Sequence, residues 1–176
     1  TDTAAAAMTF LADTNALIID VTQCRGGNPQ MVSFILSYLM PEPVHVNSFY
    51  NRVTNETTHF YTQADVPGKR FGGEKPVYVL TGPQTFSAGE EFVYDLQTQG
   101  RATLVGETTG GAAHFGGPVE VGGGLFQLFL PVGRPINPVT GTNWEGTGVQ
   151  PDIAVPKELA LATAHREALR QIQAGL

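Results

Sequence analysis

Residues 77–92, VYVLTGPQTFSAGEEF, decide the fold, because they combine a strand, a tight turn and the start of a helix. The β-branched and aromatic run Val77–Leu80 is typical of a buried strand. Apolar residues at helical spacing begin at Phe92 and stop at Gly100, which predicts a helix of about three turns. Ser87 therefore lies at a strand–turn–helix junction.

Two interpretations of Ser87 compete at this junction. In the first, Ser87 caps the helix, and Glu90 three residues later completes a Ser-x-x-Glu capping box. In the second, Ser87 is a nucleophile, held where backbone N–H groups and the positive end of the helix stabilise an oxyanion. Because serine is a preferred N-cap residue, the local pattern alone favours the cap, and the choice depends on the rest of the chain.

The composition fits a globular chain and excludes several classes of partner. A length of 176 residues suits a single catalytic-core domain over residues 1–176. The net charge of −6 argues against nucleic acid, which requires clustered Lys and Arg. No apolar run approaches the roughly 18 residues of a membrane-spanning helix, so no membrane partner is expected. The single cysteine excludes an internal disulfide, and no residue pattern requires a metal or an organic cofactor.

The start of the chain carries two further expectations. The first eight residues lack the basic start and cleavage pattern of a signal peptide, so the compartment stays open between bacterial periplasm, secretion and cytoplasm. An alanine-rich helix opens so abruptly at Thr1 that we expect a fragment lacking an N-terminal helical region. That missing region of the same protein is therefore an expected partner.

Strand and helix patterns alternate along the chain. Helices are expected over residues 4–11, 29–39 and 157–174, and further strands over 16–21 and 102–105. Antiparallel pairs are expected between 44–51 and 56–62 and between 118–121 and 125–131, with a glycine-rich turn over 110–117 and a long loop over 134–153. The apolar face of the last helix is expected to hold Leu159, Ala162, Ala168, Leu169 and Ile172. This alternation predicts an α/β fold with a mostly parallel central sheet, helices packed on it and some antiparallel strands.

A second strand-to-helix junction resembles the one at Ser87. The apolar strand over residues 16–21 leads through Gly26-Gly27 into the helix that begins at Pro29. The carboxyl ends of parallel strands open onto one edge of a sheet, so the two junctions could face each other. One N–H from Gly26 or Gly27 and one from Ala88 would then form an oxyanion hole, in which each donor is worth roughly 3–4 kcal/mol.

A serine nucleophile also requires a base, and His114 is the best candidate within the chain. It lies among small residues in the glycine-rich turn, where a histidine at the open edge of a sheet could reach the nucleophile. Glu145 follows the only tryptophan and could orient the base or a water, or it could cap a turn.

The other reactive side chains are interpreted as structural or secondary. None of the three lysines lies between residues 76 and 156, which argues against a Ser–Lys pair shortly after Ser87. The remaining histidines are interpreted as structural, His45 and His59 in a hairpin and His165 on a surface helix. Cys24 beside Arg25 is a rival nucleophile, since a neighbouring cation lowers a thiol pKa, but no helix N-terminus lies directly behind it.

Several motifs in the same order resemble one family. Leu17–Val21 with Gly26-Gly27, Phe86–Glu90, Gly100–Glu107 and Gly148–Ile153 resemble the C-terminal processing (tail-specific) serine protease superfamily. The chain is most similar to the branch without a PDZ domain, which includes tricorn-type proteases and the modules of interphotoreceptor retinoid-binding protein. This resemblance implies a ClpP/crotonase-like β-α superhelix and peptide-bond hydrolysis through an acyl-enzyme. It places Ser87 on the family nucleophile, and Gly26 or Gly27 with Ala88 on the oxyanion donors.

The chain departs from the family at the general base. Tail-specific members place a lysine 25 residues after the serine, where this chain has Ala112. Tricorn-type members place a glutamate near 58 residues after the serine, which is Glu145 here, and take their histidine from an upstream segment. The base is therefore either His114 or a residue upstream of Thr1.

These observations lead to three functional hypotheses. The first is a serine peptidase that acts on a peptide or protein substrate, with a homo-oligomer as a possible assembly. The second is a non-catalytic module that binds retinoid or fatty-acid-like apolar ligands on the same fold. The third is an acyl-CoA enzyme of crotonase type, ranked last because no basic residues cluster to hold the CoA phosphates.

Overall fold

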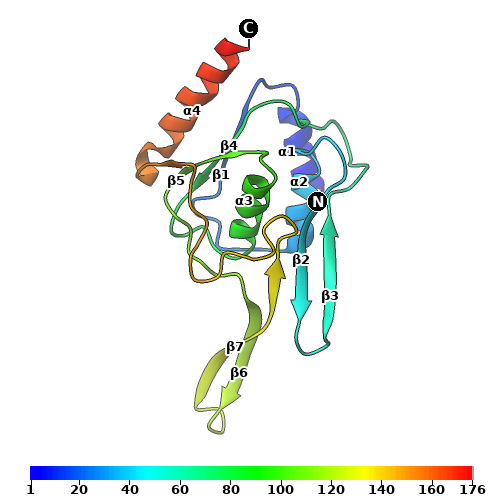
Figure 1. The fold of residues 1–176 in the computed structure, drawn as a ribbon, viewed down its shortest axis with the longest axis vertical. Helices are drawn as coiled ribbons and strands as arrows, with labels where there is room; N and C mark the ends of the chain where they lie inside the picture. The colour runs from blue at the N-terminus through cyan, green and yellow to red at the C-terminus, as the bar shows by residue number, and fades with distance from the viewer. Residues whose placement is uncertain (176) are drawn as a thin grey trace.

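The computed structural model describes residues 1–175, which form two four-stranded sheets and four helices (Figure 1). In chain order the elements are α1 Asp2–Leu11, β1 Leu17–Asp20, α2 Pro29–Leu36, β2 His45–Asn51, β3 Glu56–Tyr61, β4 Val77–Thr81, α3 Ala88–Thr98, β5 Thr103–Gly106, β6 Phe115–Val121, β7 Phe126–Ile136, β8 Ile153–Ala154 and α4 Lys157–Ala174. The expected α/β architecture is confirmed. None of the helices within residues 1–175 is long and apolar enough to cross a membrane.

The first sheet is parallel, with strand order β1-β4-β5-β8. All five residues of β4 are buried, as its continuous apolar run predicts for a central parallel strand. Alternate side chains of β4 enter two separate cores. Val77 and Val79 belong to the larger core with α1, α2 and α3, whereas Tyr78 and Leu80 belong to a smaller core with α4. The sheet is therefore covered on both faces.

The helix α4 has the expected bounds but a different buried face. Ala160, Ala164 and Ala168 are buried at a spacing of four residues and pack against β4 and β5. Of the residues expected on this face, only Ala168 is buried, and Leu159 and Leu169 are about half exposed. Small alanine side chains allow the helix axis to approach the sheet closely, which turns the larger leucines outward.

The second sheet is antiparallel, with strand order β3-β2-β7-β6. The strand β7 extends to Ile136, so the expectation of a loop from residue 134 is wrong, and β6 begins at Phe115 rather than at residue 118. Prolines are tolerated in β7 because its two halves have different partners. Pro131 pairs with β6 beside a register shift, and Pro135 pairs with β2 beyond the end of β6, so each proline has a free side.

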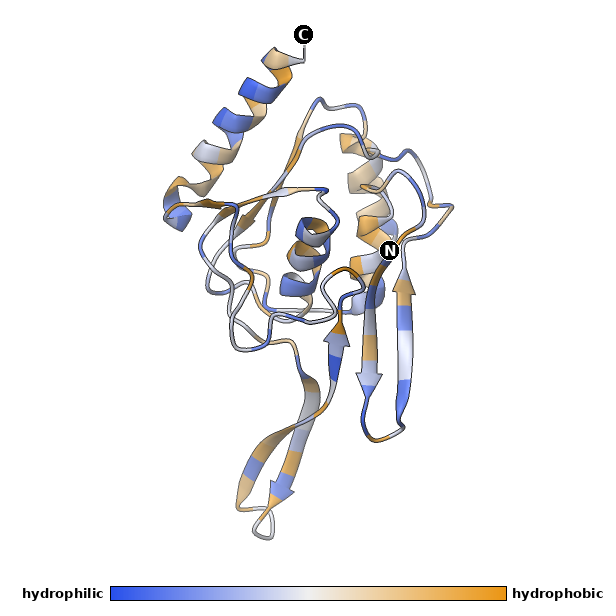
Figure 2. Ribbon diagram, viewed as in Figure 1, coloured by the Kyte–Doolittle hydropathy of each residue, from blue (hydrophilic) through white to orange (hydrophobic). Residues whose placement is uncertain are grey.

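The hairpin formed by β6 and β7 projects from the body of the molecule, next to the hairpin formed by β2 and β3 (Figure 1). Figure 2 shows hydrophobic residues along the projecting strands. The base of this hairpin meets the loops that follow β4 and β5, where the candidate site lies.

Candidate active site

Ser87 has an uncommon backbone conformation. Its φ of 53° and ψ of −122° place it in a region that residues other than glycine rarely adopt, and within residues 1–175 the only other non-glycine residue with positive φ is Asn55 in a hairpin turn. Asparagine tolerates such angles in turns, whereas serine has no comparable preference. Strain of this kind persists where the surrounding structure enforces it, and it clusters at functional sites.

Hydrogen bonds from two loops enforce this conformation. The Thr85 hydroxyl donates to the Val21 carbonyl at 2.9 Å and accepts from the Gly82 N–H at 3.1 Å. The Phe86 N–H donates to the Cys24 carbonyl at 2.9 Å. The loop after β1 and the loop after β4 are therefore joined directly in front of Ser87.

Glycines allow the first loop to approach Ser87. A Cβ on Gly26 would lie 3.0 Å from Ser87 Cβ and 3.3 Å from Ser87 Oγ, and the φ of Gly26 is 125°. A Cβ on Gly27 would lie 4.0 Å from Ala88 Cβ. The two junctions thus lie in contact at the carboxyl edge of the parallel sheet, where the sequence places them.

Three backbone N–H groups at this contact have no acceptor. Within residues 1–175, the N–H groups of Gly26, Gly27 and Ala88 donate no hydrogen bond. The next N–H groups of α3 are satisfied, since those of Glu90 and Glu91 donate to the Ser87 carbonyl at 2.8 and 3.0 Å. These three unpaired donors therefore lie next to Ser87, while the following N–H groups of α3 have acceptors.

A comparison of the four serines distinguishes Ser87 from the rest. Ser33 and Ser37 are buried in α2 and at its end, and both donate to backbone carbonyls. Ser48 is buried in β2, with its hydroxyl 2.8 Å from both His45 Nε2 and His59 Nδ1. Ser87 is exposed, and its hydroxyl donates no hydrogen bond within residues 1–175.

Glu90 has a larger role than the capping box predicted from sequence. Its buried carboxylate accepts the Ser87 N–H at 3.0 Å, so the capping pattern is present. The same carboxylate accepts the Thr109 hydroxyl at 2.6 Å and the N–H groups of Gly111 and Ala112 at 2.6 and 2.9 Å. Glu90 therefore connects the serine turn to the loop that carries His114, a long-range contact that local sequence does not reveal.

His114 and Glu145 lie together on the neighbouring loops. The Glu145 carboxylate accepts the N–H groups of Ala113 and His114 at 2.7 Å each, and His114 Nδ1 lies 3.8 Å from Glu145 Oε1. Both side chains are more than a third accessible to solvent. Glu145 therefore caps this turn, as one of the two interpretations expects, and its role in orienting a base stays a prediction.

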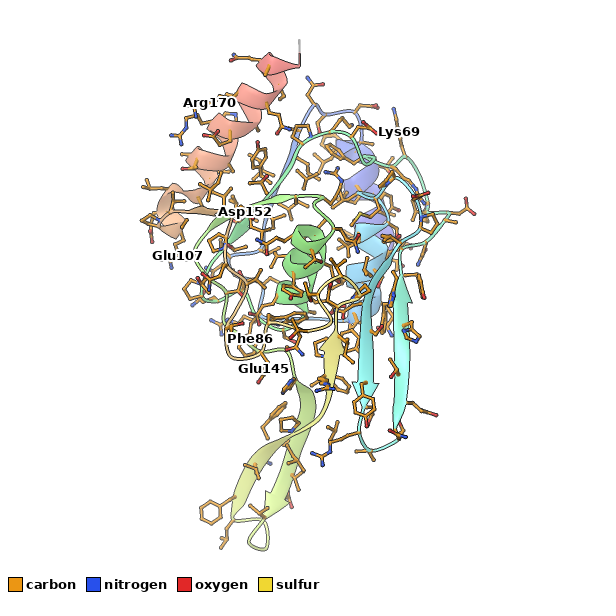
Figure 3. All side chains as sticks on the ribbon, viewed as in Figure 1. Lys69, Phe86, Glu107, Glu145, Asp152 and Arg170 are labelled. Carbon is orange, nitrogen blue, oxygen red and sulfur yellow. The ribbon has the colours of Figure 1, made fainter. Side chains whose placement is uncertain are left out.

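The same loop reaches the serine turn on its other side. Figure 3 shows Phe86 and Glu145 near the point where the β6–β7 hairpin leaves the body. A Cβ on Gly110 would lie 2.6 Å from Phe86 Cδ2, so the loop backbone packs against the Phe86 ring. No hydrogen bond joins Ser87 Oγ to His114 or Glu145 in the described part of the chain.

Of the secondary candidates, Cys24 lies beside the serine turn, since its carbonyl accepts the Phe86 N–H and a Cβ on Gly89 in α3 would lie 3.1 Å from its sulfur. Cys24 is half-buried, and its sulfur lies 3.8 Å from the Gly26 carbonyl oxygen. His45 and His59 interact with Ser48, and His165 is exposed on α4. Across residues 1–175, no group of three His, Cys, Asp or Glu side chains is placed to hold a metal ion.

An apolar cavity of about 180 Å³ adjoins the contact between the two loops. Its rim includes Gly26, Gly27 and Ala88. Its remaining lining comes from β1 and its loop, α2 and α3, namely Ile19, Val21, Cys24, Asn28, Met31, Val32, Ile35, Gly89 and Phe92. The cavity has room for one apolar side chain next to Ser87.

A buried acidic pair in α3 was not predicted from sequence. Burial raises the pKa of Glu91 to about 8, and the pKa of Asp95 lies well above its usual range because of burial and the neighbouring Glu91. Asn137 donates to Asp95 Oδ1 at 3.1 Å, but one carboxyl oxygen of each acid has no partner within residues 1–175. The spacing of four residues on an otherwise apolar helix face is the signal that could have identified this pair.

Several solved structures with the same fold are proteases. A photosystem II D1 C-terminal processing protease matches with a TM-score of 0.70 and 20% identity, over 90% of this chain and 40% of that chain. Mature CPAF complexed with lactacystin matches with a TM-score of 0.74 and 18% identity, over 97% and 46%. The tricorn protease matches with a TM-score of 0.59 and 18% identity, over 93% and 16%. The chain thus spans less than half the length of each.

The sequence itself identifies the family. Residues 1–155 match the family model of peptidase family S41, which is most of the chain. The chain therefore belongs to peptidase family S41, and the resemblance to C-terminal processing and tricorn-type proteases is confirmed.

Proposed function

We propose that this chain is the core of a serine peptidase with Ser87 as the nucleophile. Ser87 Oγ attacks the carbonyl carbon of a peptide bond, and its proton passes to a general base. The C–N bond then breaks, the amine leaves with that proton, and an ester remains on Ser87. Water adds to the ester with help from the same base, which releases the acid and restores the hydroxyl.

The observation that carries this proposal is the set of free N–H groups of Gly26, Gly27 and Ala88 around an exposed, strained serine. Donors without acceptors are costly inside a folded chain unless a ligand or water satisfies them. A tetrahedral oxyanion formed on attack by Ser87 would accept hydrogen bonds from these N–H groups. Because the negative charge develops only on attack, these hydrogen bonds would stabilise the transition state more than the bound substrate.

Within this proposal the first candidate for the base is His114. The Glu145 carboxylate accepts the backbone N–H groups of Ala113 and His114, and its Oε1 lies 3.8 Å from His114 Nδ1. The rival is a histidine from a part of the protein outside residues 1–176, as the tricorn-type resemblance implies. The His114→Ala variant distinguishes them. If His114 is the base, kcat/KM falls by roughly 10²–10⁴ and the low-pH limb of the rate profile disappears. A change below twofold assigns the base elsewhere.

The apolar cavity is the feature on which one alternative function would depend, the binding of a retinoid or fatty-acid-like ligand. Its volume of about 180 Å³ is below the roughly 300–1,000 Å³ of pockets that enclose such ligands. A pocket for one apolar substrate side chain, next to the scissile bond, agrees better with this size.

A fluorophosphonate probe applied to the full-length protein tests the proposal. We expect one label on Ser87, located by peptide mapping, which is abolished in Ser87→Ala. The matched control is Ser48→Ala, which removes a buried serine whose hydroxyl lies 2.8 Å from ring nitrogens of His45 and His59. Absence of label on Ser87 at neutral pH, together with saturable retinol binding that survives Ser87→Ala, would replace the peptidase proposal with the binding module.

A further inference from the structure

A second cleft, of about 350 Å³, lies beside His114 at the base of the β6–β7 hairpin. Its walls come from β2 and the residue that follows its end, from β7 and from the turn before β6, namely Tyr50, Arg52, His114, Pro131, Gly133 and Arg134. It shares no lining residue with the apolar cavity behind Gly26 and Ala88. A substrate that reaches His114 would therefore meet a different chemical environment on this side.

Sheet register places the two arginines on the same face. Tyr50 in β2 pairs with Arg134 in β7, and the Arg52 N–H donates to the Val132 carbonyl at 2.9 Å. Arg52 and Arg134 are thus diagonal neighbours on adjacent strands, about 7–8 Å apart at the backbone and within reach of long side chains.

Neither guanidinium has a partner within residues 1–175. No ion pair and no side-chain hydrogen bond involves Arg52 or Arg134, whereas Arg101 donates to the carbonyls of Leu39 and Gly72. The chain has 16 acidic residues against 10 basic ones, so carboxylates are abundant elsewhere. Two like charges on adjacent strands repel each other, and a bound anion would offset that repulsion.

We propose that this cleft binds a carboxylate of the peptide substrate through Arg52 and Arg134. Guanidinium groups donate two parallel hydrogen bonds to a carboxylate, which gives both affinity and orientation. The inference rests on the proposed peptidase function for its position next to His114. The carboxylate is supplied by the C-terminus of the substrate or by an Asp or Glu side chain near the cut.

Binding of labelled peptides to the full-length Ser87→Ala variant tests this inference without requiring turnover. One peptide is compared with its C-terminal amide, and a second pair exchanges Asp for Asn near the centre. We expect one of the two carboxylates to tighten binding by roughly 10-fold or more, with the advantage shrinking as salt rises. The pair that responds identifies the source of the carboxylate.

Arginine variants then assign the effect to the cleft. Arg52→Gln and Arg134→Gln should each reduce the carboxylate advantage, and the double variant should abolish it while binding of the neutral peptides is retained. Arg170→Gln removes an equal charge from an exposed side chain on α4 and should leave the carboxylate advantage unchanged. Thermal unfolding of each variant checks folding, and the single variants decide the outcome if the double variant unfolds.

Two results would overturn the inference: equal binding of charged and neutral peptides, or a carboxylate advantage that survives in both single variants. Failure of the peptidase proposal is seen separately, as absence of fluorophosphonate label on Ser87. Carboxylate binding that depends on Arg52 and Arg134 without such labelling would keep the anion site and reject the hydrolase.

Discussion

The parallel sheet and the projecting β6–β7 hairpin are both built from apolar strands, but only the sheet is buried. All five residues of β4 are buried between the two cores that cover its faces. In the hairpin, Val119, Val121, Phe126, Leu128 and Leu130 share one face by register, and each is more than 40% exposed. Glu120 and Gln127 lie on the other face.

This difference shows what a hydrophobic pattern reports. A continuous apolar run, as in β4, predicts cover on both faces, and here the helices of the same chain provide it. In the hairpin, large apolar side chains gather mainly on one face, with Phe129 as the exception on the other. Such a face predicts cover, and nothing within residues 1–175 provides it. An apolar pattern therefore predicts that a strand face is covered, but it does not say whether the same chain or another molecule covers it.

The largest expected effect lies in the parallel sheet. Leu104 in β5 is fully buried in the larger core, so Leu104→Ala should lower the free energy of unfolding by about 3 kcal/mol through lost burial and a cavity. Urea unfolding followed by circular dichroism measures the loss. A loss below about 1 kcal/mol in the free energy of unfolding would mean that the core around the parallel sheet is less tightly packed than the burial of Leu104 indicates.

The stability of the parallel sheet and its helices should depend on pH, because α3 carries the buried acids Glu91 and Asp95. Because the folded pKa of Glu91 is raised to about 8, folded Glu91 keeps a proton that the unfolded chain loses above pH 4.5. The free energy of unfolding should therefore fall as pH rises from about 4.5 to 8, with a contribution on the order of 1 kcal/mol per pH unit. The raised pKa of Asp95 acts in the same direction.

Denaturant unfolding at several pH values measures this slope. Glu91→Gln should flatten it, whereas Glu120→Gln, an exposed change in the hairpin, should leave it as in the unaltered chain. An unaltered slope in Glu91→Gln would contradict the assignment.

The smallest effect is expected in the hairpin. Leu128→Ala repeats the Leu104 substitution on a side chain that is 54% exposed, so the free energy of unfolding should change by only about 0.5 kcal/mol or less. The same urea titration compares the two variants directly. A loss similar to that of Leu104→Ala would show that the hairpin face is covered in solution.

Much of the fold could be predicted from local patterns. The junction at Ser87 and the bounds of α4 follow from caps, turns and periodicity over a few residues. The buried face of α4 could not be predicted, because hydrophobicity favours leucine while the closeness of helix and sheet favours alanine. The path of β7 through Pro135 depends on where its two neighbours end, which only the sheet register defines.

In the candidate site too, some contacts could be predicted from the sequence and others could not. Contact between the loops at Gly26 and Ser87 was predictable, since parallel strands end at one edge. The long-range role of Glu90 and the meeting of Arg52 with Arg134 depend on tertiary contacts between distant segments, which local spacing does not encode. The pairing of Ser87 with His114 stays a prediction.

The four hydrogen bonds to Glu90 also affect how the molecule fluctuates. The buried carboxylate of Glu90 accepts the N–H groups of Ser87, Gly111 and Ala112. If either segment moved away alone, this carboxylate would lose hydrogen-bond donors while it stayed buried, which is costly. The serine turn and the histidine loop should therefore open as one cooperative unit, with their amide hydrogens exchanging at a shared rate. Such a unit would keep the geometry around Ser87 constant until both segments unfold together.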